Sequence, residues 1–116
     1  MRTLVVLGIV AMLAPPPATL KLSKSFCLPP CDVRADVWFN LKPEMDVRRA
    51  TLELDGEAYY RSSYIDLNEY AAKHYEIWFK TIPPGSYEAI LTLFDTTKGV
   101  YATRATLVVK GEDGHE

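Results

Sequence analysis

The stretch that decides the fold is Ile82-Pro83-Pro84-Gly85-Ser86-Tyr87-Glu88-Ala89-Ile90-Leu91-Thr92-Leu93-Phe94-Asp95. Its two prolines fix the backbone torsion φ and donate no hydrogen bonds, so a β-ladder has to stop there, and Gly85 lets the chain reverse. Beyond this corner the apolar residues alternate with other residues, which is the period of a strand with one buried face. The buried face is predicted to hold Tyr87, Ala89, Leu91 and Leu93.

The rest of the chain repeats this alternation in short runs. Strands are predicted over residues 31–41, 49–54, 57–67 (broken or bulged), 74–82 and 100–109. Asp55-Gly56 indicates a two-residue hairpin turn, and residues 68–73 indicate one helical turn capped by Asn68. About seven strands and no long run of helical period predict an all-β fold, a single antiparallel β-sandwich.

The C-terminal third resembles a known class of module. The proline-glycine corner, Tyr87, the alternating strand, Asp95, a glycine turn and a closing strand resemble the last strands of immunoglobulin-like and fibronectin-III-like modules of secreted bacterial proteins. The resemblance covers residues 31–110. It implies an immunoglobulin-like sandwich that binds or spaces without chemistry of its own, and a corner role for Tyr87, whose hydroxyl would bond the backbone.

The two ends of the chain differ from this middle. The 116 residues are enough for one domain, and the formal charge of −2 gives no reason to approach nucleic acid. Residues 1–18 hold an apolar run from Leu4 to Ala14, which is too short to span a bilayer and is typical of a secretory signal. We expect export to the periplasm or beyond, with this segment either removed or kept as a membrane tether. Residues 111–116 lack apolar side chains and predict a disordered tail.

Residues 19–30 are predicted to form an arm or edge strand with a cysteine loop. Cys27 and Cys31 are the only cysteines, and in an exported chain they predict a disulfide. Three apolar residues of the arm could add as a strand to another copy: Leu20, Leu22 and Phe26.

Catalytic and metal-binding patterns are weak. Ser62, Ser63, Asp66 and His74 offer the groups of a hydrolase triad, but no nucleophile turn accompanies them. The oxygen ligands around Asp66 do not have the spacing of a calcium loop, and His74 and His115 lie far apart. We therefore predict no catalytic residue, no metal and no cofactor.

Aromatic residues give the stronger signal. Trp38 and Trp78 fall on the polar side of their strands, and if those strands are neighbours both indoles lie on one outer face. Ile90 and Phe94 lie on the outward face of the strand that follows the corner, and this face is less polar than a face exposed to solvent usually is. A candidate contact surface therefore comprises Trp38, Trp78, Tyr59, Tyr60, Tyr64, Ile90 and Phe94. The alternative is that residues 19–30 or 68–73 fold back over these side chains.

These patterns predict an exported, non-enzymatic β-sandwich that docks to a protein partner as an accessory subunit of a membrane-associated or cell-surface complex. Two alternatives stay open. One is a filament subunit that assembles by strand addition through the arm, and the other is a carbohydrate-binding module that uses the exposed aromatics. In each case the membrane is contacted only through an uncleaved N-terminal segment.

Overall fold

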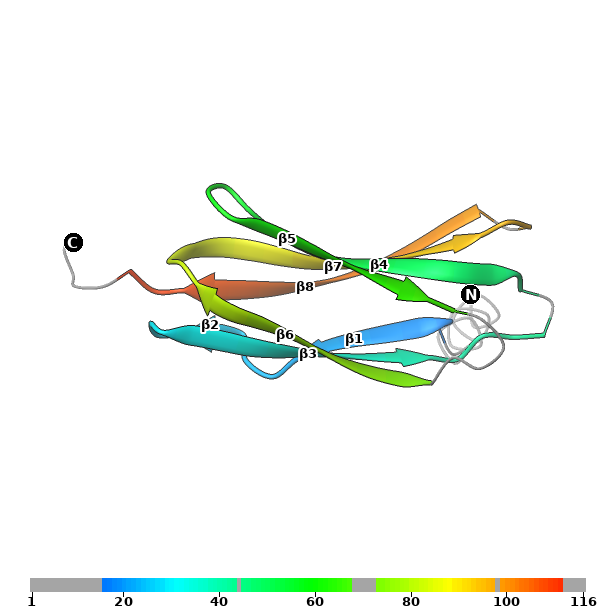
Figure 1. Ribbon diagram of the computed structural model, residues 1–116, viewed down its shortest axis with the longest axis horizontal. Helices are drawn as coiled ribbons and strands as arrows, with labels where there is room; N and C mark the ends of the chain where they lie inside the picture. The colour runs from blue at the N-terminus through cyan, green and yellow to red at the C-terminus, as the bar shows by residue number, and fades with distance from the viewer. Residues whose placement is uncertain (1–15, 44, 68–72, 98, 112–116) are drawn as a thin grey trace, which may run out of the picture.

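The computed structural model describes residues 16–43, 45–67, 73–97 and 99–111, and all regular structure in them is β (Figure 1). The strands are β1 (Ala18–Leu22), β2 (Phe26–Cys27), β3 (Cys31–Phe39), β4 (Val47–Gly56), β5 (Tyr60–Asp66), β6 (His74–Ile82), β7 (Gly85–Asp95) and β8 (Gly99–Val109). No helix in these residues is long and apolar enough to cross a membrane. Residues 1–15 of the predicted N-terminal signal, 68–72 of the predicted helical turn and 112–116 of the tail fall outside the described residues, whereas Ala18, predicted to belong to the signal segment, begins β1 and is buried.

The strands form two packed sheets, so the predicted β-sandwich is confirmed. One sheet has the order β1-β3-β6 and the other β2-β8-β7-β4-β5. Every pair is antiparallel except the short β2–β8 pair, which is parallel. The chain changes sheets between β6 and β7, at the Pro-Pro-Gly corner, where the prolines end one ladder and Gly85, with φ 153°, starts the next.

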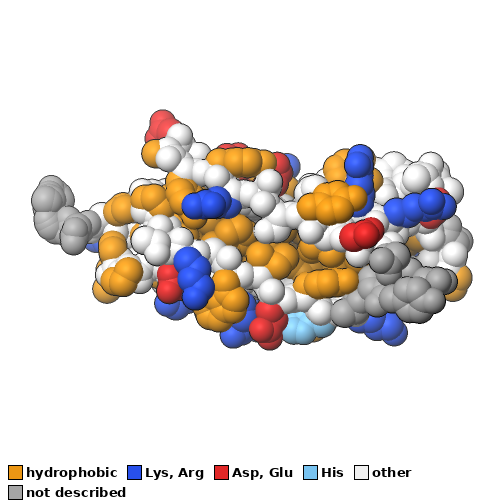
Figure 2. Space-filling view, in the orientation of Figure 1, with side chains coloured by type: hydrophobic (Ala, Val, Ile, Leu, Met, Phe, Trp, Pro, Cys, Tyr) orange, Lys and Arg blue, Asp and Glu red, His pale blue; other side chains and the backbone are white. Residues whose placement is uncertain are grey.

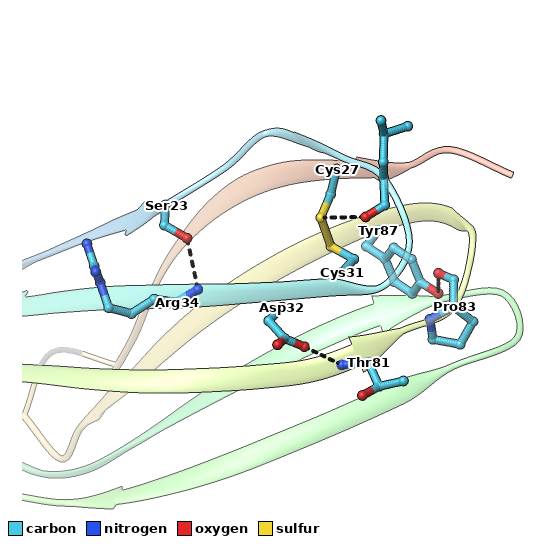
Figure 3. The surroundings of a disulfide bond; sticks show 9 residues. Ser23, Cys27, Cys31, Asp32, Arg34, Thr81, Pro83 and Tyr87 are labelled. Carbon is cyan, nitrogen blue, oxygen red and sulfur yellow. Dashed lines mark hydrogen bonds between the residues drawn. A yellow bond between two sulfur atoms is a disulfide. The ribbon is translucent and has the colours of Figure 1, made fainter. Parts of the chain in front are cut away.

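The core lies between the sheets and contains the residues that alternation predicted. Tyr87, Ala89, Leu91 and Leu93 are all buried. The Tyr87 hydroxyl donates a hydrogen bond of 2.7 Å to the Pro83 carbonyl, which confirms its corner role (Figure 3). Each fully buried leucine stabilises the fold by roughly 2 kcal/mol, so this strand anchors the five-stranded sheet.

The same corner is reinforced from β3. Cys27 and Cys31 form a disulfide that joins β2 of one sheet to β3 of the other (Figure 3). The Asp32 carboxylate accepts a hydrogen bond of 2.8 Å from the backbone N–H of Thr81, a β-branched residue held at φ 53°. These contacts hold the end of β6 in a conformation that threonine rarely adopts.

The β4–β5 hairpin is present, but its turn differs from the prediction. Asp55 pairs with Tyr60 and the Gly56 N–H bonds the Tyr59 carbonyl, so the chain reverses over Glu57 and Ala58. Gly56 belongs to the strand and pairs with Tyr87. A Cβ at Gly56 would collide with the Tyr87 ring, so this glycine is needed for close packing and not for the turn.

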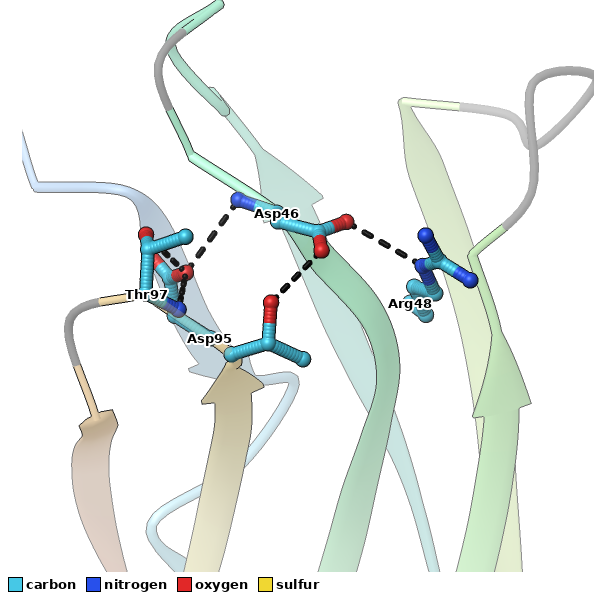
Figure 4. Close-up of polar contacts among 5 residues, drawn as sticks. Asp46, Arg48, Asp95 and Thr97 are labelled. Atoms are coloured by element: carbon cyan, nitrogen blue, oxygen red, sulfur yellow. Dashed lines mark hydrogen bonds and ion pairs between the residues drawn. The ribbon is translucent and has the colours of Figure 1, made fainter.

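Polar contacts close the opposite end of the five-stranded sheet (Figure 4). Asp95 accepts hydrogen bonds from the N–H groups of Asp46 and Thr97 at 3.2 and 2.9 Å. Asp46 in turn accepts from the Thr96 hydroxyl and from Arg48. These two bonds, the one from Thr96 first, hold the pKa of Asp46 below its usual value. The network ties the start of β4 to the end of β7.

The predicted arm is part of the sandwich. Residues of β1 pair with β3 from Ala18↔Phe39 to Leu22↔Ala35, and Leu20 and Leu22 pack against the core. Phe26 lies in β2, beside β8, with 55% of its surface exposed. Because Leu20 and Leu22 already fill positions in their own domain, addition of this arm to a second copy would require opening the fold.

Candidate functional site

Three possible metal ligands converge on the outer face of the three-stranded sheet. One ligand atom each from Asp36, His74 and Glu76 all lie within 4.8 Å of one another. Asp36 comes from β3, and His74 and Glu76 are the first and third residues of β6. Asp36 is far from His74 and Glu76 in sequence, so only the pairing of β3 with β6 brings it to them.

The register of β3 and β6 explains this convergence. Asp36 is the direct partner of Glu76, and Trp38 is the direct partner of His74. Alternation turns all four side chains toward the outer face, and directly opposed residues have Cβ atoms ~5 Å apart. His74 therefore reaches Asp36 diagonally, with its Nε2 at 3.1 Å from the Asp36 Oδ1.

Asp36 is an unusual residue for an outer face, because only 6% of its surface is exposed. Burial would raise the pKa of Asp36, but hydrogen bonds from Arg34 and His74 outweigh it and hold the pKa below its usual value. The Arg34 Nε lies 3.0 Å from the Asp36 Oδ2. Asp36 is thus a carboxylate at neutral pH, and its Oδ1 is directed toward the imidazole.

The imidazole of His74 is held by a ring contact as well. It stacks on the Trp38 indole with a centroid distance of 4.6 Å and an interplanar angle of 11°. The site opens into a hollow whose further lining residues are Lys21, Leu22, Ser23 and Arg34. A small molecule can therefore reach the ligand atoms from solvent.

One imidazole and two carboxylates are a donor set that suits zinc, iron or manganese. Ligands bound to one such ion at ~2.1 Å are about 3.3 Å apart, close to the separation of the Asp36 and His74 atoms. Glu76 is exposed, so its side chain can move by the ~1.5 Å at most that separates 4.8 Å from the coordinated distance. The residues present thus fit a metal ion.

This group of ligands was not predicted from the sequence, in which His74 has only His115 and nearby residues as evident partners. Alternation places Asp36 and Glu76 on outward faces, and that signal was available. What was lacking was the register between two strands separated by about forty positions.

The residues of the predicted contact surface do not gather on one face. Trp38 and Trp78 share the outer face of the three-stranded sheet, 41% and 51% exposed, but Trp78 pairs with Arg34 and so lies four positions, ~13 Å, from Trp38. Tyr59 packs edge to face on Tyr87. The remaining four residues of the predicted surface lie on the outer face of the five-stranded sheet: Tyr60, Tyr64, Ile90 and Phe94.

The hydrolase-like group is separated by the fold. Ser62 and Ser63 lie on β5, in the five-stranded sheet, and pair with Glu53 and Leu52. His74 lies on β6, in the other sheet, and its described partners are Asp36 and Trp38. These residues therefore do not form a serine triad.

Comparison with known proteins identifies the fold but no family. No protein-family model matches the chain, and no curated protein matches its sequence. Its structure is similar to that of the superoxide reductase (neelaredoxin) of Ignicoccus hospitalis, with 11% identity over 82% of this chain and 81% of that one and a TM-score of 0.65. A variant of the same protein gives 13% identity, 89% and 87% coverage and a TM-score of 0.62. The sporulation control protein Spo0M of Bacillus subtilis gives 12% identity and a TM-score of 0.50, and the match spans 84% of this chain and about half (51%) of that one.

These neighbours correct the functional prediction. The non-enzymatic docking subunit, with its filament and carbohydrate-binding alternatives, was inferred from a fold taken to carry no chemistry of its own. The neighbours contradict that prediction and the prediction that the chain is not an enzyme, because a fold similar to this one is found in superoxide reductases, which are redox enzymes. The arm residues Leu20 and Leu22 contradict strand addition independently, since they pack in their own core.

Proposed function

We propose that this domain binds a divalent transition-metal ion at Asp36, His74 and Glu76, and that the bound ion serves redox chemistry on a small anion. The observation that carries the proposal is the convergence of three ligand atoms within 4.8 Å of one another, in an accessible hollow. An iron or manganese ion held there would supply one-electron chemistry.

The residues around the ligands hold two of the three in fixed positions. Arg34 holds Asp36 as a carboxylate and fixes its second oxygen, while Trp38 fixes the plane of the His74 ring. Glu76 is the adjustable ligand, because it is exposed. A buried carboxylate and a stacked imidazole provide a preorganised pair that the third ligand completes.

The charges of the hollow favour an anionic substrate. The carboxylates of Asp36 and Glu76 balance the cations Arg34 and Lys21, so a divalent ion brings the local charge to about +2. Superoxide is a small anion of this kind, and its reduction is the activity in the name of the Ignicoccus neighbours. That reaction adds one electron and two protons to superoxide and yields hydrogen peroxide; a ferrous ion held by the three ligands would supply the electron, and an external electron donor would have to restore it.

Metal binding is tested by anaerobic titration of the whole protein with Fe(II), Mn(II) and Zn(II), followed by desalting and metal analysis. We expect one equivalent to bind to the wild type and none to His74→Ala. Glu76→Gln should weaken binding about tenfold or more. Glu57→Gln is the matched control, since it removes an exposed carboxylate on the turn of the other sheet. Equal binding by the wild type and His74→Ala would contradict the proposal.

Redox activity is a separate measurement. Iron-loaded protein should consume superoxide faster than the metal-free protein and faster than His74→Ala treated in the same way. If the wild type binds one iron but consumes superoxide no faster than the metal-free chain, the metal site stands and the redox part of the proposal is refuted.

We also infer that the chain is exported to the periplasm or beyond. The apolar run from Leu4 to Ala14 supports this, together with a disulfide between the only two cysteines, which persists in oxidising compartments. Cell fractionation with thiol alkylation tests it: a thiol-free protein outside the cytoplasm is expected, and alkylated cysteines in the cytoplasmic fraction would contradict it.

A further inference from the structure

A second feature lies on the open side of the sandwich, where β5 and β6 face each other. β5 ends the order of the five-stranded sheet and β6 ends that of the three-stranded sheet, so each has an edge that no described strand pairs (Figure 1). Between them runs a groove of about 290 Å³ lined by Tyr59, Arg61, Ser62, Ser63, Trp78, Phe79 and Lys80. Figure 2 looks onto this side of the molecule and shows hydrophobic side chains between the two sheets.

The groove carries charge of one sign. Its charged lining residues are Arg61 and Lys80, and neither forms an ion pair with a carboxylate in the described part of the chain. Each cation lies over an aromatic ring: Arg61 is 5.4 Å from the centroid of Tyr59, and Lys80 is 5.5 Å from that of Trp78. The groove thus combines flat apolar contact area with two unneutralised cations.

The edge of β5 is a suitable template for an added strand. Its pairing with β4 runs without a register shift from Asp55↔Tyr60 to Arg49↔Asp66, and no proline interrupts it. Such an edge exposes a regular row of backbone donors and acceptors. The end of β6 is less regular, because Thr81 adopts φ 53° and the β3–β6 register shifts there.

The cations decide what can occupy this edge. Pairing of β5 with the same edge of a second copy in the register centred on Arg61 would bring Arg61 beside its own counterpart, and like charges across a strand pair are unfavourable. An extended segment that carries carboxylates at alternate positions meets no such penalty, since its acidic side chains reach Arg61 and Lys80 while its backbone pairs with β5. The row of backbone groups further distinguishes a peptide from a polyanion without amides.

We infer that the groove between β5 and β6 binds an acidic peptide segment in extended conformation. The groove shares no lining residue with the hollow of the proposed metal ligands, and the inference does not depend on a bound metal. Arg61 and Lys80 supply the charge selection, Trp78 and Tyr59 supply apolar contact, and the edge of β5 supplies backbone hydrogen bonds.

The test is calorimetric titration of the whole protein with a blocked peptide in which glutamate and valine alternate. We expect saturable binding that weakens about tenfold or more in the variant Arg61→Gln/Lys80→Gln and when the salt concentration rises from about 50 to about 300 mM. Lys110→Gln, which removes an exposed cation outside the groove, should change the affinity less than about twofold. Circular dichroism verifies that each variant is folded.

Three results would overturn the inference. One is the absence of binding up to about 1 mM peptide. Another is equal binding of a peptide in which lysine replaces glutamate, which would remove the charge argument. The third is equal binding of polyphosphate, which carries negative charge but has no amide backbone to pair with β5.

Discussion

The contact between Gly56 and the Tyr87 ring leads to a prediction whose size can be derived from the structure. A Cβ added at Gly56 would lie inside 3.0 Å of two ring carbons of Tyr87, closer than real Cβ atoms approach. Tyr87 cannot retreat, because its ring is buried and its hydroxyl is bonded to Pro83. Overpacking of this kind costs about 1–3 kcal/mol, so Gly56→Ala should destabilise the domain by about 2 kcal/mol.

Two other glycines separate this clash from the general effect of glycine replacement. Gly99 has open space around its Cα, but its φ is 98°, so Gly99→Ala should cost about 1 kcal/mol through the backbone alone. Gly111 has neither a close neighbour nor a positive φ, and Gly111→Ala should change stability by less than about 0.5 kcal/mol.

The assay is urea unfolding followed by far-ultraviolet circular dichroism, since every described element is a strand. The expected order of destabilisation is Gly56→Ala, then Gly99→Ala, then Gly111→Ala. A double-mutant cycle with Tyr87→Leu should show that most of the Gly56→Ala effect depends on the ring. If Gly56→Ala costs no more than Gly111→Ala, or keeps its full effect beside Tyr87→Leu, the packing argument is refuted.

Three further predictions concern the core and the corner. Leu91→Ala, at a fully buried position, should lower the free energy of unfolding by about 3 kcal/mol, whereas Leu28→Ala, 62% exposed, should change it by less than about 0.5 kcal/mol. Thr81→Gly should raise it by about 1 kcal/mol, because glycine adopts φ 53° without strain; a lower midpoint in urea would argue against strain at this position. Burial, and to a lesser extent the nearby Tyr59, raises the pKa of Tyr87 in the folded protein. As pH rises, Tyr87 therefore ionises in the unfolded chain before it does so in the folded one. The stability that this residue contributes is present below pH ~10 and is lost as pH rises through the folded pKa. Tyr87→Phe should therefore cost about 1 kcal/mol at neutral pH, and the difference from the wild type should shrink above pH ~10; a constant difference up to pH ~11 would contradict this account.

The local features of the fold could be predicted from the sequence. Alternation in Cys31–Phe39 and Gly85–Asp95 assigned the inward and outward side chains, because successive residues of a strand point to opposite faces whatever the strand pairs with. The prolines, Gly85 and Tyr87 predicted the corner and its hydroxyl bond, since each acts within a few residues. The loop of Cys27 and Cys31 is equally local.

Only the tertiary structure decided which of these local features meet. The register of β3 with β6 brings Asp36 to His74 and Glu76, and the assignment of β5 and β7 to the other sheet separates Tyr64 and Phe94 from the tryptophans. Tertiary packing also decides the place of the hairpin turn, which lies beyond Gly56 because that glycine packs against the Tyr87 ring. The physical reason is that period-two alternation fixes a side chain's face, while register and sheet membership depend on packing between segments distant in the chain. Which residues point outward can therefore be predicted from the sequence, whereas a site that several of them form together cannot.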